Sequence, residues 1–512
     1  MRAEKAEYLP LCDFKRNMIN RFEPGEFFSK LFDFNKRFHG QTLIDEIMNS
    51  IDYHNKPISK KKDDSMSTSR LHIAAICLIG MITSANALES KVYLTNDSDS
   101  VLNVQLAESP STSIMLLPYT TQQIFAVQRD DLTKIKEVQK YHLAIASDKF
   151  PHQPLVYEIA KYHELLSSKL MHWLKLPDES EQPLFVNPHE VTKIQTGWND
   201  NYQLFAKEKL TLGHVYDDQF LVVHQTVEPY SLKAEQANEL SVLNYNTQLL
   251  PFYTGVVDKL NQPGIRAQLI PYRIPEDDVV VFEELFDKAH RVMVKILMEN
   301  RGYEYHTEVI GEGTHNVLTG GVMIFSKWPI ENTDAVVYPN CHGVDCLADK
   351  GVAYVDINKL GKHYHLFATH LQADDDDASV KVRSQQLQTI HDFITSHGIS
   401  PTEPVLLAGD LNIDLFSPEY QHLTAHLPVL LPDNSGYPYS YDGNVNQMAI
   451  SKVAQRLDYV FALKGYAQPT SMKSHVLVLR EMEAEALWPN VELSDHFPLE
   501  AVFTFDTKDT SL

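Results

Sequence analysis

The sequence contains few cysteines, an excess of acidic over basic residues, and no long apolar run. Four cysteines in 512 residues are too few for a fold held together by disulfides. The 45 Lys and Arg residues against 68 Asp and Glu give a formal net charge of −23, so the chain lacks the basic footprint of a nucleic-acid-binding protein. With 43% hydrophobic and 22% charged residues, the composition excludes disorder, collagen and a multi-span membrane protein.

One short apolar run lies within residues 66–87, MSTSRLHIAAICLIGMITSANA. Arg70 provides a positive n-region, Leu71–Ile82 an apolar stretch and Ala85–Ala87 a small-residue cleavage site, which is the pattern of a secretory signal peptide. The run is shorter than the ~20 residues that a membrane-spanning helix needs, and a membrane anchor is the alternative. We therefore predict a secreted protein, extracellular or periplasmic, that is cleaved after Ala87.

A signal peptide normally opens a chain, but here residues 1–65 precede it. We predict that translation begins at Met66 and that residues 1–65 are an over-extended start; a genuine cytoplasmic segment is the alternative. Cleavage leaves Cys341 and Cys346, five residues apart. Export permits a disulfide between them, and no second cysteine pair is present to complete a zinc site.

Residues 88–230 are predicted to form a β-rich accessory domain that contains one helix. Short β-type runs are separated by Asn, Asp, Ser and Pro, which predicts a small antiparallel unit; they are Val92–Leu94, Val101–Leu106, Ser113–Leu117 and Gln122–Val127. A further set of apolar residues recurs at helical spacing: Leu155, Ile159, Tyr162, Leu166, Leu170 and Trp173. This region contains no catalytic constellation, and residues 231–238 form a polar linker.

Residues 239–507 are predicted to form one α/β domain, because buried-type strands alternate with helices. The expected helices are Lys288–Glu299 and Ser379–Ser396. The expected strands are Leu240–Leu243, Val279–Phe282, Val322–Phe325, Ala353–Ile357, His365–Thr369, Val405–Ala408, Asp458–Ala462 and Leu499–Phe505. Ligands of α/β folds gather at strand ends, so residues at these ends are candidates for a site.

Polar residues with catalytic or metal-binding capacity stand at several of these strand ends. They are Asn246, Glu284, His370, Asp410, Asn412, Asp458, Asp495 and His496. Each alone is typical of a turn or a structural histidine, but together they indicate metal-assisted phosphoester hydrolysis. Carboxylate and amide oxygens suit Mg²⁺ and disfavour zinc. A histidine with an orienting acid can deprotonate the attacking water.

Three motifs in this order resemble the endonuclease/exonuclease/phosphatase superfamily: GDLN (Gly409–Asn412), LDYVF (Leu457–Phe461) and SDHFP (Ser494–Pro498). Four others resemble the secreted bacterial sphingomyelinases within it: VVVFEELFD (Val279–Asp287), TGGVMIFSKWPI (Thr319–Ile330), DKGVAY (Asp349–Tyr354) and ATHLQADD (Ala368–Asp375). The resemblance covers residues 239–505. It implies a four-layered sandwich of two mixed β-sheets flanked by helices, after the accessory domain.

The resemblance implies a Mg²⁺ site with Mn²⁺ or Co²⁺ as substitutes. Glu284 resembles the main ligand, Asn246 lies beside it, and Asp495 resembles a further carboxylate of the metal site. Asp410 and Asn412 resemble the pair that positions the phosphate, the nucleophile or a second metal. These five residues are the metal-site candidates.

The resemblance also implies the catalytic roles. His496 resembles the general base and Asp458 its orienting partner, while His370 resembles the second histidine, which stabilises the phosphoryl group or assists the leaving alcohol. Asp442 falls in the same region. Lys350 is a candidate for a positive charge near the phosphate, with an exposed surface lysine as the alternative.

The implied reaction is Mg²⁺-dependent hydrolysis of sphingomyelin to ceramide and phosphocholine. The implied partner is a sphingomyelin-containing membrane surface, with no nucleic acid and a monomeric protein. Haemolytic relatives carry a long aromatic hairpin before the SDH motif, but this stretch is shorter and acidic here. Leu487 and Trp488 remain candidates for a bilayer contact, because Trp suits the membrane interface. Acidic residues weaken attraction to anionic lipid, so strong haemolysis is not expected.

Three alternatives remain open. The first is a phospholipase C of other lipid selectivity. The second is a phosphodiesterase or nuclease on the same scaffold; an inositol-phosphate phosphatase is disfavoured because Ile413 and Asp414 follow the GDLN motif where an Arg is typical. The third is a lipid-binding toxin module without catalysis, which EDTA would leave active.

Overall fold

The structure is a computed structural model, and it describes residues 89–107, 109–128, 138–163, 168–187, 189–210, 217–226, 236–251, 261–313 and 317–506. All of them belong to one unit of the chain, 84–512. The predictions for residues 1–65 and for the signal peptide at 66–87 therefore lie outside the described residues. No helix of the described part is long and apolar enough to cross a membrane.

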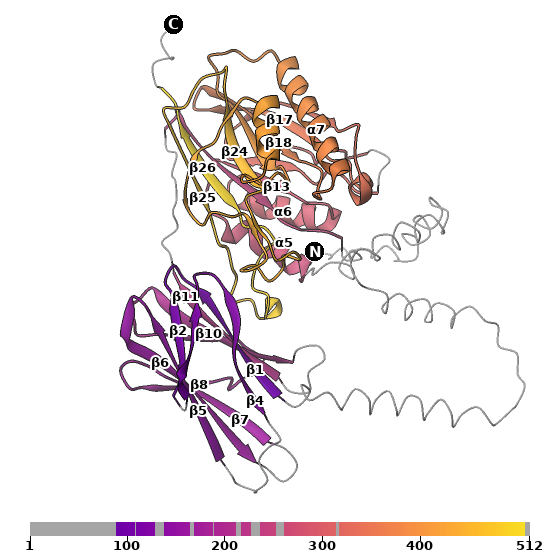
Figure 1. Cartoon of the computed structure of the whole chain (residues 1–512). Coiled ribbons are helices and arrows are strands. Elements are labelled where there is room, and N and C mark those ends of the chain that lie inside the picture. Colours follow the sequence, from indigo (N-terminus) through magenta and orange to yellow (C-terminus); the bar gives the residue numbers. More distant parts are fainter. Residues whose placement is uncertain are drawn as a thin grey trace, which may run out of the picture. The chain divides into compact units, whose positions relative to one another are not determined.

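The N-terminal region is a β-sandwich of two sheets (Figure 1). The five-stranded sheet has the order β4 (Thr121–Gln128), β1 (Glu89–Asp97), β11 (Asp217–Gln225), β10 (Tyr202–Leu210) and β9 (Thr192–Gln195). The six-stranded sheet has the order β3 (Ser109–Leu116), β2 (Leu102–Leu106), β5 (Val138–Ser147), β6 (Phe150–His163), β7 (Ser168–Lys175) and β8 (Glu181–Leu184). One apolar core joins residues of both sheets, as in sandwiches whose inner faces interdigitate.

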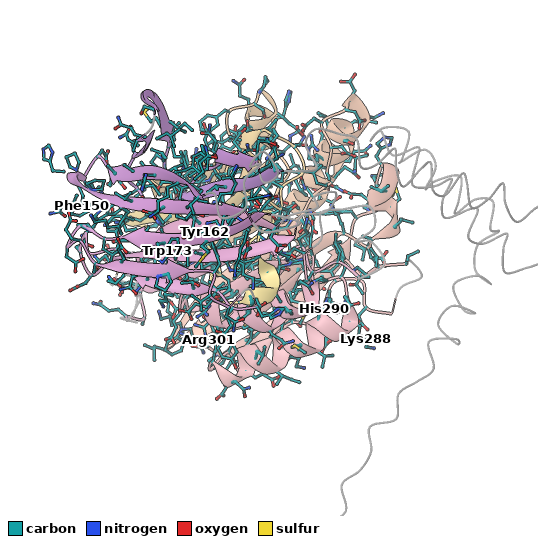
Figure 2. The ribbon with its side chains drawn as sticks, turned by 90° about the horizontal axis from the view of Figure 1, so that it is seen from below. Phe150, Tyr162, Trp173, Lys288, His290 and Arg301 are labelled. Atoms are coloured by element: carbon teal, nitrogen blue, oxygen red, sulfur yellow. A yellow bond between two sulfur atoms is a disulfide. The ribbon has the colours of Figure 1, made fainter. Side chains whose placement is uncertain are left out.

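The helix predicted within this region is wrong, because β6 and β7 occupy its place. Leu155, Tyr157 and Ile159 alternate inward along β6 and are fully buried. A spacing of four residues fits both a helix and a strand with period two, and the inward Tyr157 distinguishes them. Tyr162 and Trp173 lie on these strands (Figure 2), and Leu166 lies outside the described residues.

The C-terminal region contains two mixed sheets, which confirms an α/β domain preceded by a β-rich region. The seven-stranded sheet has the order β14 (Tyr305–His306), β15 (Met323–Ser326), β13 (Val279–Glu283), β12 (Glu239–Asn246), β26 (Leu499–Thr504), β25 (Ser471–Val476) and β21 (Asp433–Gly436). The six-stranded sheet has the order β16 (Ile330–Val337), β17 (Gly351–Lys359), β18 (Lys362–His370), β19 (Val405–Asp410), β24 (Asp458–Leu463) and β20 (Val429–Leu430). Strands β22 (Tyr441–Asp442) and β23 (Ala454–Gln455) form a small separate pair.

Each sheet carries helices on its outer face (Figure 1). Helices α5 (Pro263–Arg273) and α6 (Lys288–Asn300) share a core with the seven-stranded sheet. Helices α7 (Asp377–Ser396) and α8 (Glu419–His426) share one with the six-stranded sheet. The 3₁₀ turns are η3 (Gly343–Leu347) and η4 (Glu485–Leu487).

The inner faces of the two sheets share a third core. Central strands β13, β19 and β24 are buried at every position, since strands covered on both faces become continuous apolar runs. Polar residues at their ends are therefore held on rigid, buried elements, and these ends build the site.

Candidate active site

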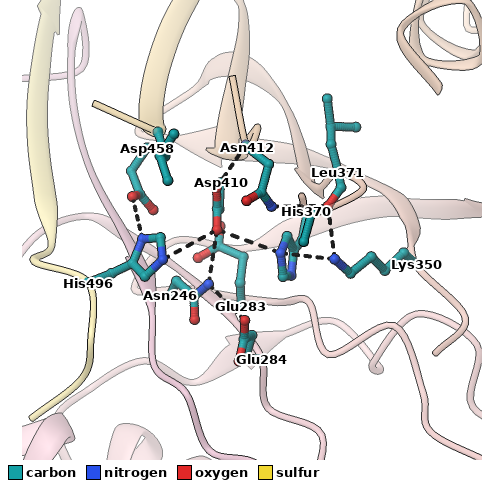
Figure 3. Close-up of polar contacts among 12 residues, drawn as sticks. Asn246, Glu283, Glu284, Lys350, His370, Leu371, Asp410, Asn412, Asp458 and His496 are labelled. Carbon is teal, nitrogen blue, oxygen red and sulfur yellow. Dashed lines mark hydrogen bonds and ion pairs between the residues drawn. The ribbon is translucent and has the colours of Figure 1, made fainter. Parts of the chain in front are cut away.

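Six chain segments bring their terminal polar residues together at one edge of the two sheets (Figure 3). Asn246 ends β12, Glu284 follows β13, His370 ends β18, Asp410 ends β19 and Asp458 begins β24. His496 comes from the segment before β26. The predicted strand-end residues therefore lie in one cluster, although up to 250 positions of sequence separate them.

The centre of the cluster is the buried carboxylate of Asp410. Its Oδ2 accepts a hydrogen bond from Asn246 Nδ2 at 3.0 Å and lies 3.6 Å from His370 Nε2 and 3.8 Å from His496 Nε2. Its Oδ1 accepts from the backbone N–H of Asn412 at 2.9 Å. The two histidines lie on either side of this carboxylate (Figure 3).

His496 and Asp458 form a buried pair. His496 Nδ1 lies 2.8 Å from Asp458 Oδ2, and Asn244 Nδ2 donates to the other carboxylate oxygen at 3.3 Å. An ionised carboxylate only accepts, so Nδ1 carries the proton and Nε2 faces Asp410. Burial lowers the pKa of His496, but the carboxylates of Asp458 and Asp410 outweigh it and hold this pKa well above its usual range.

Glu284 and Asp495 form the acidic side of the cluster. Both are partly exposed, yet the surrounding protein desolvates them, which raises the pKa of Asp495 and, together with the charge of Asp495, raises the pKa of Glu284 to about 7. Asn246 Nδ2 donates to Glu284 Oε1 at 3.1 Å. A bound cation would favour the ionised form of both carboxylates, and carboxylate oxygens are ligands that Mg²⁺ prefers.

Lys350 is buried beside His370 and is not a surface lysine. Its Nζ lies 3.1 Å from His370 Nε2, 2.7 Å from Asp345 Oδ2 and 2.9 Å from Leu371 O. Burial first, and then the Lys350 charge, lower the pKa of His370 to about 3. His370 is therefore neutral, with Nε2 as the acceptor and the proton on Nδ1.

Asp442 lies next to the cluster but bonds away from it. Its carboxylate accepts from Tyr437 OH at 2.5 Å and from Asn444 N at 2.8 Å. The neighbouring Tyr441 contacts the site instead, with its ring 5.2 Å from that of His496. Asp442 therefore shapes the loop that carries Tyr441.

The predicted bilayer contact of Leu487 and Trp488 is wrong. Their side chains are 0% and 1% exposed. The indole N–H of Trp488 donates to Met482 O at 2.9 Å, and its ring packs with Phe205 and Val222 of the β-sandwich. The acidic residues near Trp488 indicated an exposed loop. In the structure, sandwich residues that are distant in sequence cover Trp488.

The disulfide that the sequence left open is present in the structure. Cys341 and Cys346 are bonded, with their Cα atoms 5.2 Å apart, across the short turn η3. Because His342 N donates to Gln372 Oε1, this cross-linked turn is attached to the strand end that carries His370. The same turn contains Asp345, the partner of Lys350.

Three buried residues of the site were missed from sequence. Arg266 donates to the carbonyls of Thr247, Gln248 and Leu493 at 2.8 Å each, and so ties the segment after Asn246 to the segment before Asp495. Ser494 Oγ donates to Asn246 O at 2.7 Å. Burial and the charges of Asp458 and Asp410 raise the pKa of Glu283 well above its usual range. Ser494, in the SDH motif, and Glu283, in the VVVFEELFD motif, carried a sequence signal, and Arg266 carried none.

Gly321 is required by the backbone of Glu284. Glu284 has φ 58°, and Gly321 has φ +73°; a Cβ on Gly321 would lie 3.1 Å from Glu284 Cα and 2.8 Å from Phe286 Cε1. We expect Gly321→Ala to lower the free energy of unfolding by ~1–3 kcal/mol, measured by urea titration, and to lower activity. Gly302→Ala, with φ +88° and open space, is the control: an equal loss would exclude crowding at Glu284.

Residues 243–496 match the model of the Endonuclease/Exonuclease/phosphatase family. The sphingomyelinase C of Listeria ivanovii is 32% identical over 264 residues, which span 46% of this chain and 78% of that protein. The chain therefore belongs to the endonuclease/exonuclease/phosphatase family. Within it, the chain is a homologue of the bacterial sphingomyelinases C.

Two further comparisons found similar proteins. Sphingomyelinase C 2 of Leptospira interrogans is 33% identical over 287 residues, which cover 51% of this chain. This chain spans about half the length of the Leptospira relatives, 45% of one and 52% of another. The crystal structure of a Staphylococcus aureus beta toxin variant with bound magnesium ions is 27% identical, with a TM-score of 0.47, and covers 51% of this chain and 99% of that one.

Proposed function

We propose that this chain is a divalent-cation-dependent phosphodiesterase of phospholipase C type, which hydrolyses sphingomyelin to ceramide and phosphocholine. The observation that carries the proposal is the buried Asp458–His496 pair, whose Nε2 faces Asp410 beside the carboxylates that Asn246 contacts. Identity of 32% with a sphingomyelinase C over this same region supports the substrate class.

The cation that fits the donors is Mg²⁺, with Mn²⁺ or Co²⁺ as substitutes. Glu284, Asp495 and Asn246 provide only oxygen donors of the hard type that Mg²⁺ prefers. Asp410, Asp458 and His496 also have ligand atoms within 4.8 Å of one another, but the bond between His496 and Asp458 favours a catalytic pair. Bound Mg²⁺ would neutralise phosphoryl charge and stabilise the leaving oxygen.

The protein's own residues account for the proton transfer. Water attacks phosphorus while His496 Nε2 takes one of its protons, and Asp458 keeps the imidazole in the required tautomer and stabilises its charged form. The bond from phosphorus to the ceramide oxygen breaks, that oxygen takes up a proton from solvent, and His496 returns its proton to solvent. A neutral His370 does not supply that proton directly, so the positive charge on this side of Asp410 is that of Lys350.

Release of phosphocholine from sphingomyelin and phosphatidylcholine vesicles tests this function. With Mg²⁺ we expect release mainly from sphingomyelin, and none with EDTA, for protein that begins at Leu88. Equal release from both lipids would favour the second candidate, a phospholipase C of broader selectivity. Hydrolysis of nucleic acid alone would overturn the lipid substrate.

Secretion and a membrane-surface substrate complete the proposal. The disulfide between Cys341 and Cys346 suits an exported protein, and the segment at 66–87 has the pattern of a signal peptide. A substrate embedded in a sphingomyelin-containing membrane must be reached by a surface other than Leu487 and Trp488, since both are buried. A monomer stays our prediction.

A further inference from the structure

The segment Arg480–Glu492 forms a closed loop that leads directly into the catalytic segment. Arg480 and Glu492 pair through their backbones and through Arg480 Nε and Glu492 Oε1 at 3.1 Å. Both side chains are buried. Ser494 and His496 follow within four residues, so the position of the loop's closing pair sets where the chain enters the site.

Arg480 joins this loop to the N-terminal β-sandwich. Its Nη1 donates to Asp97 Oδ1 at the end of β1 at 2.6 Å, and its Nη2 donates to Tyr119 O in the turn after β3 at 2.9 Å. The other oxygen of Asp97 lies 2.7 Å from His224 Nδ1 on β11. The guanidinium is 0% exposed and Asp97 6% exposed, so Arg480 compensates the charges of Asp97 and Glu492 away from solvent.

The rest of the loop also rests on the sandwich. Trp488 packs with Phe205 and Val222. Lys207 Nζ lies 2.8 Å from Glu485 Oε1, and Lys209 Nζ donates to Trp488 O. Apolar burial, ion pairing and a side-chain hydrogen bond to a backbone carbonyl therefore act together on one short segment.

A second route runs from Arg480 to His496. Arg480 Nη2 also donates to Val445 O at 2.8 Å, in the loop that follows Tyr441, whose ring contacts His496. On the sandwich side, the Tyr119 ring lies 5.5 Å from that of Tyr437, which in turn lies 5.9 Å from Phe497. Both segments that flank the His496 imidazole are thus fastened to the sandwich.

We propose that the N-terminal β-sandwich is a built-in positioning element for the general base, and that Arg480 is the positioning residue through which it acts. The proposal rests on the proposed function for the role of His496, but the contacts that it invokes do not depend on the substrate. Sandwich residues separated from His496 by nearly 400 positions would then set the catalytic rate without touching substrate.

The test compares Arg480→Met, Asp97→Asn and Arg480→Lys with the wild type on a water-soluble phosphocholine diester, which removes membrane binding from the measurement. We expect kcat to fall by about tenfold to hundredfold for Arg480→Met, as for a catalytic group displaced by ~1 Å, with little change in KM. Arg480→Lys should restore part of kcat. Asp99→Asn is the control, because Asp99 is an exposed sandwich residue paired with Lys149.

Hydrogen exchange of residues 494–497, followed by mass spectrometry, is the readout that does not need activity. Faster exchange there in Arg480→Met, together with the loss of kcat, supports the proposal. Unchanged exchange and kcat, or an equal loss in Asp99→Asn, overturns it. If the wild type hydrolyses no phosphodiester, the proposed function fails while the exchange still decides the role of Arg480.

Removing Arg480 alone leaves the buried carboxylates of Asp97 and Glu492 without their cationic partner, which can prevent folding. The triple variant Asp97→Asn, Arg480→Met and Glu492→Gln removes the three charges together and avoids this cost. We expect it to fold, to keep the low kcat and to exchange rapidly at residues 494–497. A folded triple variant with wild-type kcat would contradict the positioning role.

Discussion

Replacing His496 with alanine is expected to lower kcat/KM by about 10²–10⁴-fold, the share of a general base, or more because His496 acts as a unit with Asp458. The reason is geometric: Asp458 holds the Nδ1 proton at 2.8 Å, which leaves Nε2 as the only nitrogen able to accept a proton from water. Phosphocholine release under saturating Mg²⁺ measures the effect.

The pH dependence of kcat/KM, compared between the wild type and His496→Ala, gives a second test of the general base. Because carboxylates raise the pKa of His496 in the metal-free site, the base form is lost as the pH falls through this raised value. A bound cation opposes those carboxylates and moves that limb to lower pH. The acidic limb should disappear in His496→Ala. The control is His391→Ala, because His391 is an exposed histidine on α7. If His496→Ala retained full activity, His496 would not be the general base.

Removal of the cation or of its main ligand is expected to have the second large effect. EDTA should abolish hydrolysis and Mg²⁺ should restore it. Glu284→Gln keeps the size of the side chain but loses the charge that attracts the cation. Because the metal contributes several kcal/mol to transition-state stabilisation, we expect a loss of at least about a hundredfold.

The structure provides a matched control for this experiment. Glu179→Gln removes an exposed carboxylate of the β-sandwich that pairs with Lys175 on β7. Its activity and its Mg²⁺ titration should match the wild type. If Glu284→Gln kept both wild-type activity and wild-type Mg²⁺ affinity, Glu284 would not be a ligand.

Much of the site was predictable because it is built from short motifs at the ends of buried strands. The runs VLLAGD and DYVFAL are buried at every position, and so the strand ends Asp410 and Asp458 follow from local pattern. Their convergence follows from the ladder, in which Asp410 pairs with both His370 and Asp458.

The remainder depended on contacts between distant parts of the chain. Asp97 and Arg480 are 383 positions apart, and neither has a local signal for the other. Trp488 read as an exposed interfacial residue because its cover comes from β10 and β11. Lys350 read as a surface residue because its partners Asp345 and His370 lie on separate elements.

Hydrolysis of sphingomyelin in ¹⁸O-labelled water, with Mg²⁺, tests the central claim most directly. Water attack on phosphorus with loss of the ceramide oxygen places one solvent oxygen in phosphocholine and none in ceramide. We predict this distribution for the wild type and almost no product for His496→Ala. Labelled ceramide phosphate with free choline, or product formed equally well by His496→Ala, would contradict the account.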